Sequence, residues 1–170
     1  MGDGPADSKI APAVEMRPIF QGVPLSANQR DASGPVVVPW ESLPDVGIRD
    51  RLVSAIIERR KVSTAALALD YAIGRELLPQ PGHGAVLIDS RDRPVAVIEF
   101  AGVRSTLLGE VDLSHAVDEG EGHATVETWR AAHEAHWHSE QVRAELGNPS
   151  FTVNDTAAVV LERFRVIERL

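Results

Sequence analysis

The sequence predicts an α+β protein whose sheet curls into a small barrel flanked by helices. Three patterns indicate this fold. Apolar residues recur at helical spacing after residue 45, two apolar runs flank a short polar turn near the middle, and a β-branched run ends the chain. The elements therefore follow the order helix, strands, helices, strand.

Composition limits the classes of protein to which this chain can belong. Its 170 residues suit a single domain with a tail, and 44% hydrophobic residues are enough for a sizeable core. The absence of cysteine excludes a disulfide scaffold, a thiolate zinc site and a cysteine nucleophile. The sequence has neither an apolar stretch of ~20 residues nor a signal-peptide pattern, so we expect a cytoplasmic protein that binds no membrane.

The formal net charge of −8 argues against a protein that coats duplex DNA, because such proteins neutralise many phosphates. We therefore expect no DNA partner. Five cations within residues 49–61 leave two interpretations open, namely a local basic surface or the solvated face of a helix.

Residues 1–44 differ in composition from the rest of the chain. Seven of the 11 prolines lie in this segment. Proline removes backbone donors and is excluded from helix interiors, so we expect a Pro/Gly-rich tail that is largely disordered. Residues 35–40, which end in Trp40, are the part that could dock on the core. The folded domain is predicted to span residues 45–170.

The folded domain is predicted to open with a helix from Asp45 to about Arg60, because apolar residues recur there every three or four positions. Residues 65–78 fit either a helix or a strand. In chain order the remaining elements are predicted as strands at 85–89 and 94–100 around a polar turn, a short helix capped by Asp112 or Ser114, a long helix from Thr125 to Leu146, and a strand at 157–167.

Two polar clusters carry the functional signal. The first is the loop Glu119-Gly120-Glu121-Gly122, whose glycines allow a sharp bend and a close approach to a ligand. The second, Lys61-Val62-Ser63-Thr64, follows the first predicted helix. We hypothesise that the two clusters form one site.

These residue types are compatible with nucleophilic and acid–base catalysis. A threonine hydroxyl such as that of Thr64 becomes a nucleophile when a base takes its proton. Lys61 can be that base if desolvation makes its amine neutral, and Glu119 can protonate a leaving group or orient water. The alternative for Lys61 is a helix-end lysine that answers exposed carbonyls. However, the chain has 15 arginines and only two lysines, so an exposed cation here would more often be arginine.

Other candidates each have a structural alternative. Glu121 is either a second acid or a loop carboxylate held by backbone amides near a helix start. Trp129 either packs in the core or stacks on a flipped base. Arg130 either pairs with a loop glutamate or contacts a phosphate. Tyr71 either lines the pocket or is a half-buried tyrosine of the barrel.

The histidines do not predict a metal site. His133, His136 and His138 lie in one predicted helix, but a zinc site needs three or four convergent ligands, and His138 would point about 200° away from His136. We therefore predict no metal and no cofactor, and we expect His133 to brace the glycine loop by hydrogen bonds.

Together these motifs resemble the ASCH domain, a member of the PUA-like β-barrel group. The resemblance spans residues 45–168 and includes the Glu-Gly-Glu-Gly, Trp-Arg and His elements of a longer bacterial subfamily. The chain departs from the pattern at Arg60, His123 and 136–137. The residues that carry the resemblance are Lys61, Thr64, Pro79, Gly82, 85–89, 93–95, Glu110, Val111, 116–119, Gly120, Glu121, Gly122, Trp129, Arg130 and His133.

This resemblance implies a PUA-like fold that binds a modified nucleoside or single-stranded RNA. It also implies the hydrolysis of N4-acylcytidines, as in the similar N4-acetylcytidine amidohydrolases, by Lys61, Thr64 and Glu119. Two alternatives stay open: a non-catalytic single-stranded RNA-binding module and a metal-independent ribonuclease. The residues expected to contact the substrate are Arg60, Ser63, Tyr71, Glu121, Trp129 and Arg130.

Overall fold

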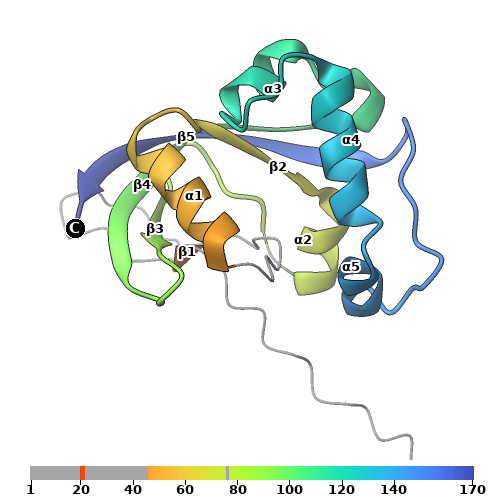
Figure 1. Cartoon of the computed structure of the whole chain (residues 1–170), viewed down its shortest axis with the longest axis horizontal. Coiled ribbons are helices and arrows are strands. Elements are labelled where there is room, and N and C mark those ends of the chain that lie inside the picture. The colour runs from red at the N-terminus through yellow and green to blue at the C-terminus, as the bar shows by residue number, and fades with distance from the viewer. Residues whose placement is uncertain (1–19, 22–45, 76) are drawn as a thin grey trace, which may run out of the picture.

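The computed structural model describes residues 20–21, 46–75 and 77–170 (Figure 1). The predicted tail at 1–44, including the docking segment at 35–40, lies outside the described residues except for Phe20–Gln21. None of the helices in these described ranges is long and apolar enough to cross a membrane.

A single antiparallel sheet organises the domain, with the strand order β1-β3-β4-β5-β2. The two long strands β4 and β5 pair along most of their length, and the sheet curls around them into an open half-barrel (Figure 1). This confirms the predicted α+β class and the curled sheet. The strands are β1 (Phe20–Gln21), β2 (Ser63–Leu67), β3 (Gly84–Ile88), β4 (Pro94–Leu107) and β5 (Ala158–Arg169).

Helix α1 (Val46–Ile57) covers the curled part of the sheet (Figure 1). Its apolar stripe of Leu52, Val53 and Ile56 is buried against β3 and β4, as the three-to-four-residue spacing predicts. Arg59 then adopts a left-handed conformation with φ of 60°, which ends the helix and turns the chain into β2.

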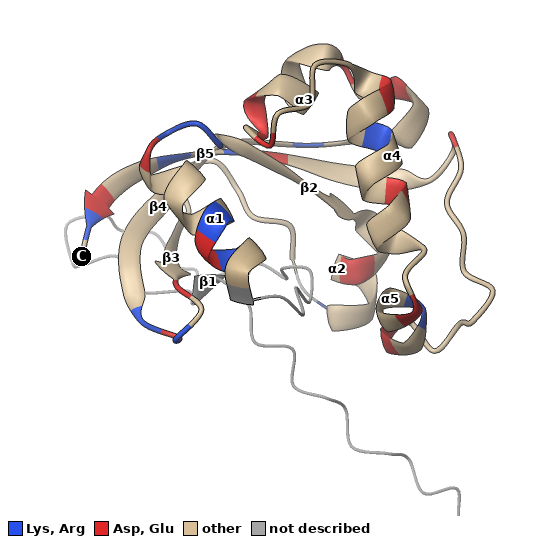
Figure 2. Ribbon diagram, in the orientation of Figure 1, with Lys and Arg blue, Asp and Glu red and all other residues tan. Residues whose placement is uncertain are grey.

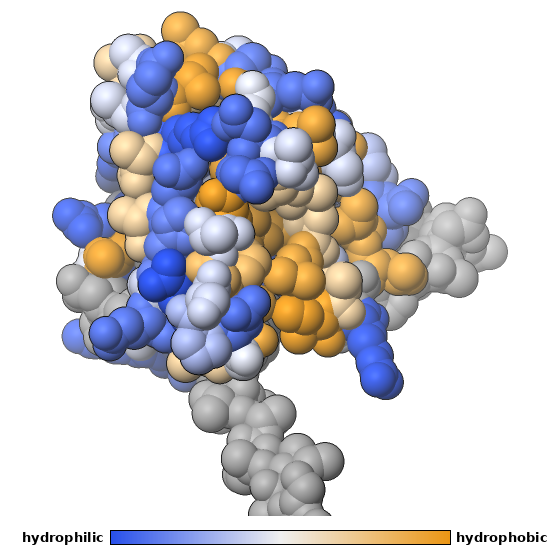
Figure 3. Space-filling model, turned by 90° about the vertical axis from the view of Figure 1, so that its right-hand side faces the viewer, coloured by the Kyte–Doolittle hydropathy of each residue, from blue (hydrophilic) through white to orange (hydrophobic). Residues whose placement is uncertain are grey.

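The ambiguous segment at 65–78 is divided between two elements, because its first residues complete β2 and helix α2 (Ala68–Gly74) follows at once. All five residues of β2 are buried, which explains why small alanines occupy this strand. The helix leaves Leu69 and Ile73 exposed. Figure 3 shows apolar side chains gathered on the face of the molecule that carries α2, α4 and α5.

A second core lies on the other face of the sheet, under α3 and α4. Trp129, Trp137 and Ala116 are buried there against Val159 and Leu161 of β5. The elements of this layer are the 3₁₀ turn η1 (Leu108–Glu110) and the helices α3 (Leu113–Asp118), α4 (Val126–Trp137) and α5 (Glu140–Glu145).

The caps of this layer follow from the sequence, but one predicted helix does not. Asp112 caps α3, and Thr125 forms a capping box with Thr128 at the start of α4. The prediction of one helix from Thr125 to Leu146 is wrong, because α4 ends at Trp137 and a separate helix begins at Glu140. The Ser139 hydroxyl accepts the backbone N–H of Val142 and so starts α5 as a separate helix.

The glycine loop approaches the end of α1 closely. Gly120 has φ of +67°, and a Cβ placed on it would lie 2.1 Å from the carbonyl oxygen of Arg60. Nearby, the backbone N–H of Val62 donates to the carbonyl oxygen of Asp118 at 2.8 Å. Only glycine therefore allows the loop to lie against the α1–β2 junction.

Replacing Gly120 with alanine should destabilise the domain more than the same change at Gly122. Both glycines have positive φ, so both substitutions introduce strain of about 1 kcal/mol. A Cβ at Gly122 meets no atom within 4 Å, whereas at Gly120 it meets backbone. Urea unfolding of Gly120→Ala beside Gly122→Ala measures the difference. Equal losses for the two variants would show that the loop can move away from the α1–β2 junction.

Candidate functional site

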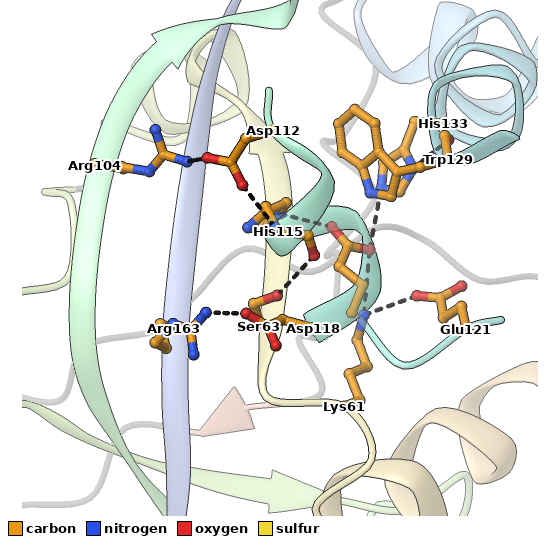
Figure 4. Close-up of polar contacts among 11 residues, drawn as sticks. Lys61, Ser63, Arg104, Asp112, His115, Asp118, Glu121, Trp129, His133 and Arg163 are labelled. Atoms are coloured by element: carbon orange, nitrogen blue, oxygen red, sulfur yellow. Dashed lines mark hydrogen bonds and ion pairs between the residues drawn. The ribbon is translucent and has the colours of Figure 1, made fainter. Parts of the chain in front are cut away.

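A buried lysine lies at the junction of α1 and β2. The Lys61 side chain is 1% exposed, and its backbone N–H donates to the carbonyl oxygen of Ala55. Its ammonium nitrogen Nζ lies 2.8 Å from Oε1 of Glu121 and 3.5 Å from Oε2 of Glu119 (Figure 4). The two polar clusters of the sequence therefore meet in the fold.

Glu119 is the buried centre of this group. Its side chain is 1% exposed, and both oxygens are engaged. Oε1 lies 3.0 Å from Nε2 of His115, while Oε2 faces Lys61 and lies 3.4 Å from Nε2 of His133. Burial alone would raise the pKa of Glu119. The Lys61 charge and the hydrogen bonds from the two histidines outweigh it and hold the pKa well below its usual range.

Aromatic rings of α4 position His133. The His133 ring stacks on Trp129, with centroids 4.1 Å apart, and meets Trp137 edge-on at 5.2 Å. Its Nδ1 lies 3.0 Å from the carbonyl oxygen of Trp129, which leaves Nε2 directed at Glu119. The sequence predicts that His133 holds the glycine loop by hydrogen bonds, and in the structure it contacts the loop through the carboxylate of Glu119.

Helix α3, which carries His115 and ends directly before Glu119, is fixed to the sheet by polar contacts (Figure 4). Arg104 on β4 donates to Asp112 at 2.6 Å, and Arg163 on β5 pairs with Asp118. The Ser63 hydroxyl donates to the backbone carbonyl of His115 at 3.4 Å. Ser63, a predicted substrate contact, thus holds the backbone of α3.

Thr64 lies on the other face of the sheet from this cluster. Successive strand residues point to opposite faces, and Ser63 points toward α3. Thr64 is buried, and it lies opposite Glu162 in the β2–β5 register. Within the described residues its hydroxyl makes no hydrogen bond to Lys61 or Glu119. The structure therefore brings Lys61 and Glu119 into contact but not the Thr64 hydroxyl.

The predicted substrate contacts Arg60 and Arg130 both have acidic neighbours. Arg60 is exposed, pairs with Glu58 at 2.7 Å, and borders a groove of about 510 Å³ between α1 and the glycine loop. Arg130 pairs with Glu134 at 2.7 Å and with Asp155, rather than with a loop glutamate.

The predicted substrate contacts Trp129 and Tyr71 are both buried. Trp129 belongs to the core under α4, so a base could stack on it only after that core opened. The Tyr71 hydroxyl donates to Oε1 of Glu162.

Sequence analysis missed His115 and Glu162 as functional candidates. Glu162 is 1% exposed, and its Oε2 has no hydrogen-bond partner within the part of the chain that the structure describes. Burial raises the pKa of Glu162 to about 7, although the hydrogen bond from Tyr71 acts in the opposite direction. One signal was available, because Glu162 is a lone acid at the end of the apolar run 157–161.

No group of three or more His, Cys, Asp or Glu side chains that could hold a metal ion occurs among the described residues. His138 has another role, since its Nε2 accepts the backbone N–H of Val153 at 3.0 Å.

Residues 40–168, which make up most of the chain, match the ASCH domain family. The chain belongs to the ASCH domain family. An ASCH domain from Lactobacillus crispatus JV V101 is 26% identical with a TM-score of 0.65, covering 76% of this chain and 78% of that one. A DUF984 protein from Enterococcus faecalis V583 is 22% identical with a TM-score of 0.61, covering 71% and 69%. None of the curated proteins matches the chain significantly.

Glu119→Gln should destabilise this ASCH domain strongly at neutral pH. The substitution leaves the buried Lys61 ammonium with one carboxylate instead of two, and breaking a buried ion pair typically costs about 3–5 kcal/mol. Urea unfolding at pH 7 measures this loss. Glu134→Gln is the control, because its partly exposed pair with Arg130 should contribute only about 0–1 kcal/mol.

The free energies of unfolding of wild type and Glu119→Gln should become more similar at acid pH. The folded-state pKa of Glu119 is depressed, so its contribution to stability is present above its ordinary pKa of 4.5 and is lost as the pH falls through the folded-state pKa. The stability gap between wild type and Glu119→Gln should therefore narrow below pH 4.5. A stability difference between the two proteins that stays constant with pH would show that Glu119 is not ionised in the folded state.

Glu162→Gln should have the opposite pH dependence. The folded-state pKa of Glu162 is raised, so stability is fully present below 4.5 and is lost as the pH rises through about 7. This difference in pKa corresponds to roughly 3 kcal/mol. Thermal unfolding should show Glu162→Gln to be more stable than wild type at pH 8, with little gain at pH 5. An equal effect at both pH values would be inconsistent with a raised pKa.

Proposed function

We propose that this ASCH domain binds a nucleoside or a single-stranded RNA element and hydrolyses the amide of N4-acylcytidines such as N4-acetylcytidine. The observation that supports the proposal most is the buried Lys61 ammonium between Glu119 and Glu121. Buried charges rarely improve stability over an apolar core, and perturbed ionisable groups gather at functional sites. ASCH domains are generally RNA-binding in character, which gives the ligand class.

The groove beside Glu121 supplies a route for the ligand. Glu121 is the exposed member of the cluster, with 34% of its side chain accessible, and it borders the groove together with Arg51 and Arg60. A ligand oxygen can replace the Glu121 carboxylate on Lys61. Guanidinium groups at the rim suit a phosphate or a ribose hydroxyl.

The proposed reaction uses Lys61 as a proton donor first. Two carboxylates stabilise its charged form, so the ammonium can protonate N4 of the base as the C–N bond breaks. The Thr64 hydroxyl passes its proton to a neighbouring base as Oγ1 attacks the acyl carbon, cytidine leaves, and a Thr64 ester remains. The neutral Lys61 amine then takes a proton from the water that hydrolyses this ester, so its base role falls in the second step rather than on the Thr64 hydroxyl, where the sequence analysis places it. Glu119 keeps Lys61 in place throughout.

Lys61 and Thr64 lie near opposite faces of the sheet, but β2 ends the strand order. A ligand bound at a sheet edge can contact side chains of both faces. We therefore propose that the acylated base lies across the edge of β2, with the ribose toward the groove at Glu121.

Two alternatives make different demands on the same site. A non-catalytic RNA-binding module would use Lys61 only as a charge, and a metal-independent ribonuclease would direct proton transfer at a ribose hydroxyl. The net charge of −8 suits a small ligand better than a long RNA. Figure 2 shows acidic and basic residues interspersed over the described elements rather than a continuous basic surface.

Lys61→Arg should separate catalysis from binding. Arginine keeps the positive charge but cannot exchange a proton near neutral pH. We expect nucleoside binding to persist and turnover of N4-acetylcytidine to fall by at least ~10²-fold, as for Lys61→Ala and Glu119→Gln. Product analysis by chromatography and binding by calorimetry measure the two effects. Because the groups act as a unit, the double variant Lys61→Ala/Glu119→Gln should be little worse than either single variant.

Arg165→Lys is the control for Lys61→Arg. Arg165 is an exposed residue of β5 that pairs with Glu99, so its replacement should change neither binding nor turnover. If Lys61→Arg retains full turnover, Lys61 is only an electrostatic contact and its proton-transfer role is wrong. If the wild type binds the nucleoside but turns over no N4-acetylcytidine, the binding-module alternative replaces this proposal. Cleavage of labelled single-stranded RNA without amide hydrolysis would favour the ribonuclease.

A further inference from the structure

A second polar group lies on the face of the sheet opposite the Lys61 cluster. It consists of Thr64 on β2, Glu162 on β5 and Tyr71 on α2. Apolar Ala66 and Val160 pack with Tyr71 on this face. Glu162 is fully buried here, yet its Oε2 has no hydrogen-bond partner within the described residues. Buried carboxylates are almost always satisfied, so this oxygen needs an explanation.

The register of the sheet places a hydroxyl beside that oxygen. Thr64 and Glu162 are directly opposite each other, and such pairs have Cβ atoms about 4.5–5.5 Å apart on the same face. No hydrogen bond of the Thr64 side chain occurs within the residues that the structure describes. Among the described residues, a hydroxyl without an acceptor thus lies next to a carboxylate oxygen without a donor.

Tyr71 determines which oxygen of Glu162 is available. Its hydroxyl donates to Oε1, which orients the carboxyl group and leaves Oε2 as the acceptor. Burial and Tyr71 are the two influences on the pKa of Glu162, which lies at about 7. A carboxyl group with such a pKa is half ionised at neutral pH and can accept and release a proton.

We propose that Glu162 is the general base that takes the hydroxyl proton of Thr64, with Tyr71 as the residue that positions it. This inference rests on the proposed amide hydrolysis and supplies its missing proton acceptor. The Thr64 proton moves to Oε2 as the bond from Oγ1 to the acyl carbon forms. The C–N4 bond then breaks, and N4 takes its proton from Lys61. Water later attacks the ester and gives a proton to the neutral Lys61 amine, while Glu162 returns its proton to Oγ1 as the acid leaves.

The deciding experiment compares Glu162→Gln with wild type in the turnover of N4-acetylcytidine. Glutamine keeps the shape and accepts the Tyr71 hydroxyl but cannot take a proton. We expect kcat to fall ~10²–10⁴-fold with KM nearly unchanged. Glu168→Gln is the matched control, because it removes an exposed glutamate from the same strand. Thermal unfolding confirms that each variant is folded.

The pH profile tests the assignment independently of the size of the loss. Wild-type kcat should rise with pH through about 7 as Glu162 ionises, and this limb should be absent in Glu162→Gln. Tyr71→Phe removes the hydrogen bond that lowers the pKa of Glu162, so it should move the limb to higher pH. A carboxyl group with only a structural role would leave the profile in place.

The outcomes separate this inference from the function on which it rests. Hydrolysis by wild type and Glu162→Gln at equal rates, or an unshifted limb in Tyr71→Phe, overturns the base role and leaves the amidohydrolase intact. If wild type hydrolyses no N4-acylcytidine, the proposed function falls and the base role falls with it. If Glu162→Gln does not fold, the Tyr71→Phe profile decides.

Discussion

The buried contact between Lys61 and Glu119 is the interaction on which the rest of the described structure depends. It joins residues 58 positions apart and brings the α1–β2 junction against the end of α3. Because an unpaired charge at this depth would be strongly destabilising, the surrounding elements must hold both partners together. Gly120 allows the close approach, and the Val62–Asp118 backbone hydrogen bond fixes it.

Helix α4 serves packing and electrostatics with one face. Trp129, His133 and Trp137 recur every fourth residue, so their rings lie in one column. The two tryptophans fill the core under the helix, and the histidine between them reaches Glu119. The apolar packing that stabilises α4 therefore also positions the His133 ring against the buried carboxylate of Glu119.

The sequence predicts the features that depend on local chemistry. The stripe of α1, the hairpin, the Asp112 and Thr125 caps and the meeting of Lys61 with the glycine loop all follow from spacing and motif. The break at Ser139 and the role of Glu162 do not. Glu162 meets Tyr71 across 91 positions, and only the β2–β5 register places it opposite Thr64. Long-range register is not encoded in any single segment, which is why such residues escape a sequence pattern.

Glu119 and Glu162 show how one residue type acquires two states within a single small domain. Both are fully buried, so desolvation raises the pKa of each. Glu119 has a lysine and two histidines beside it, and they reverse this effect. Among the described residues, Glu162 accepts a hydrogen bond only from the hydroxyl of Tyr71, which does not reverse it. Two acids whose environments give them different pKa values are suited to different roles in catalysis. A Glu119 that is ionised at neutral pH suits the positioning of a cation, and a Glu162 that titrates near neutrality suits the transfer of a proton.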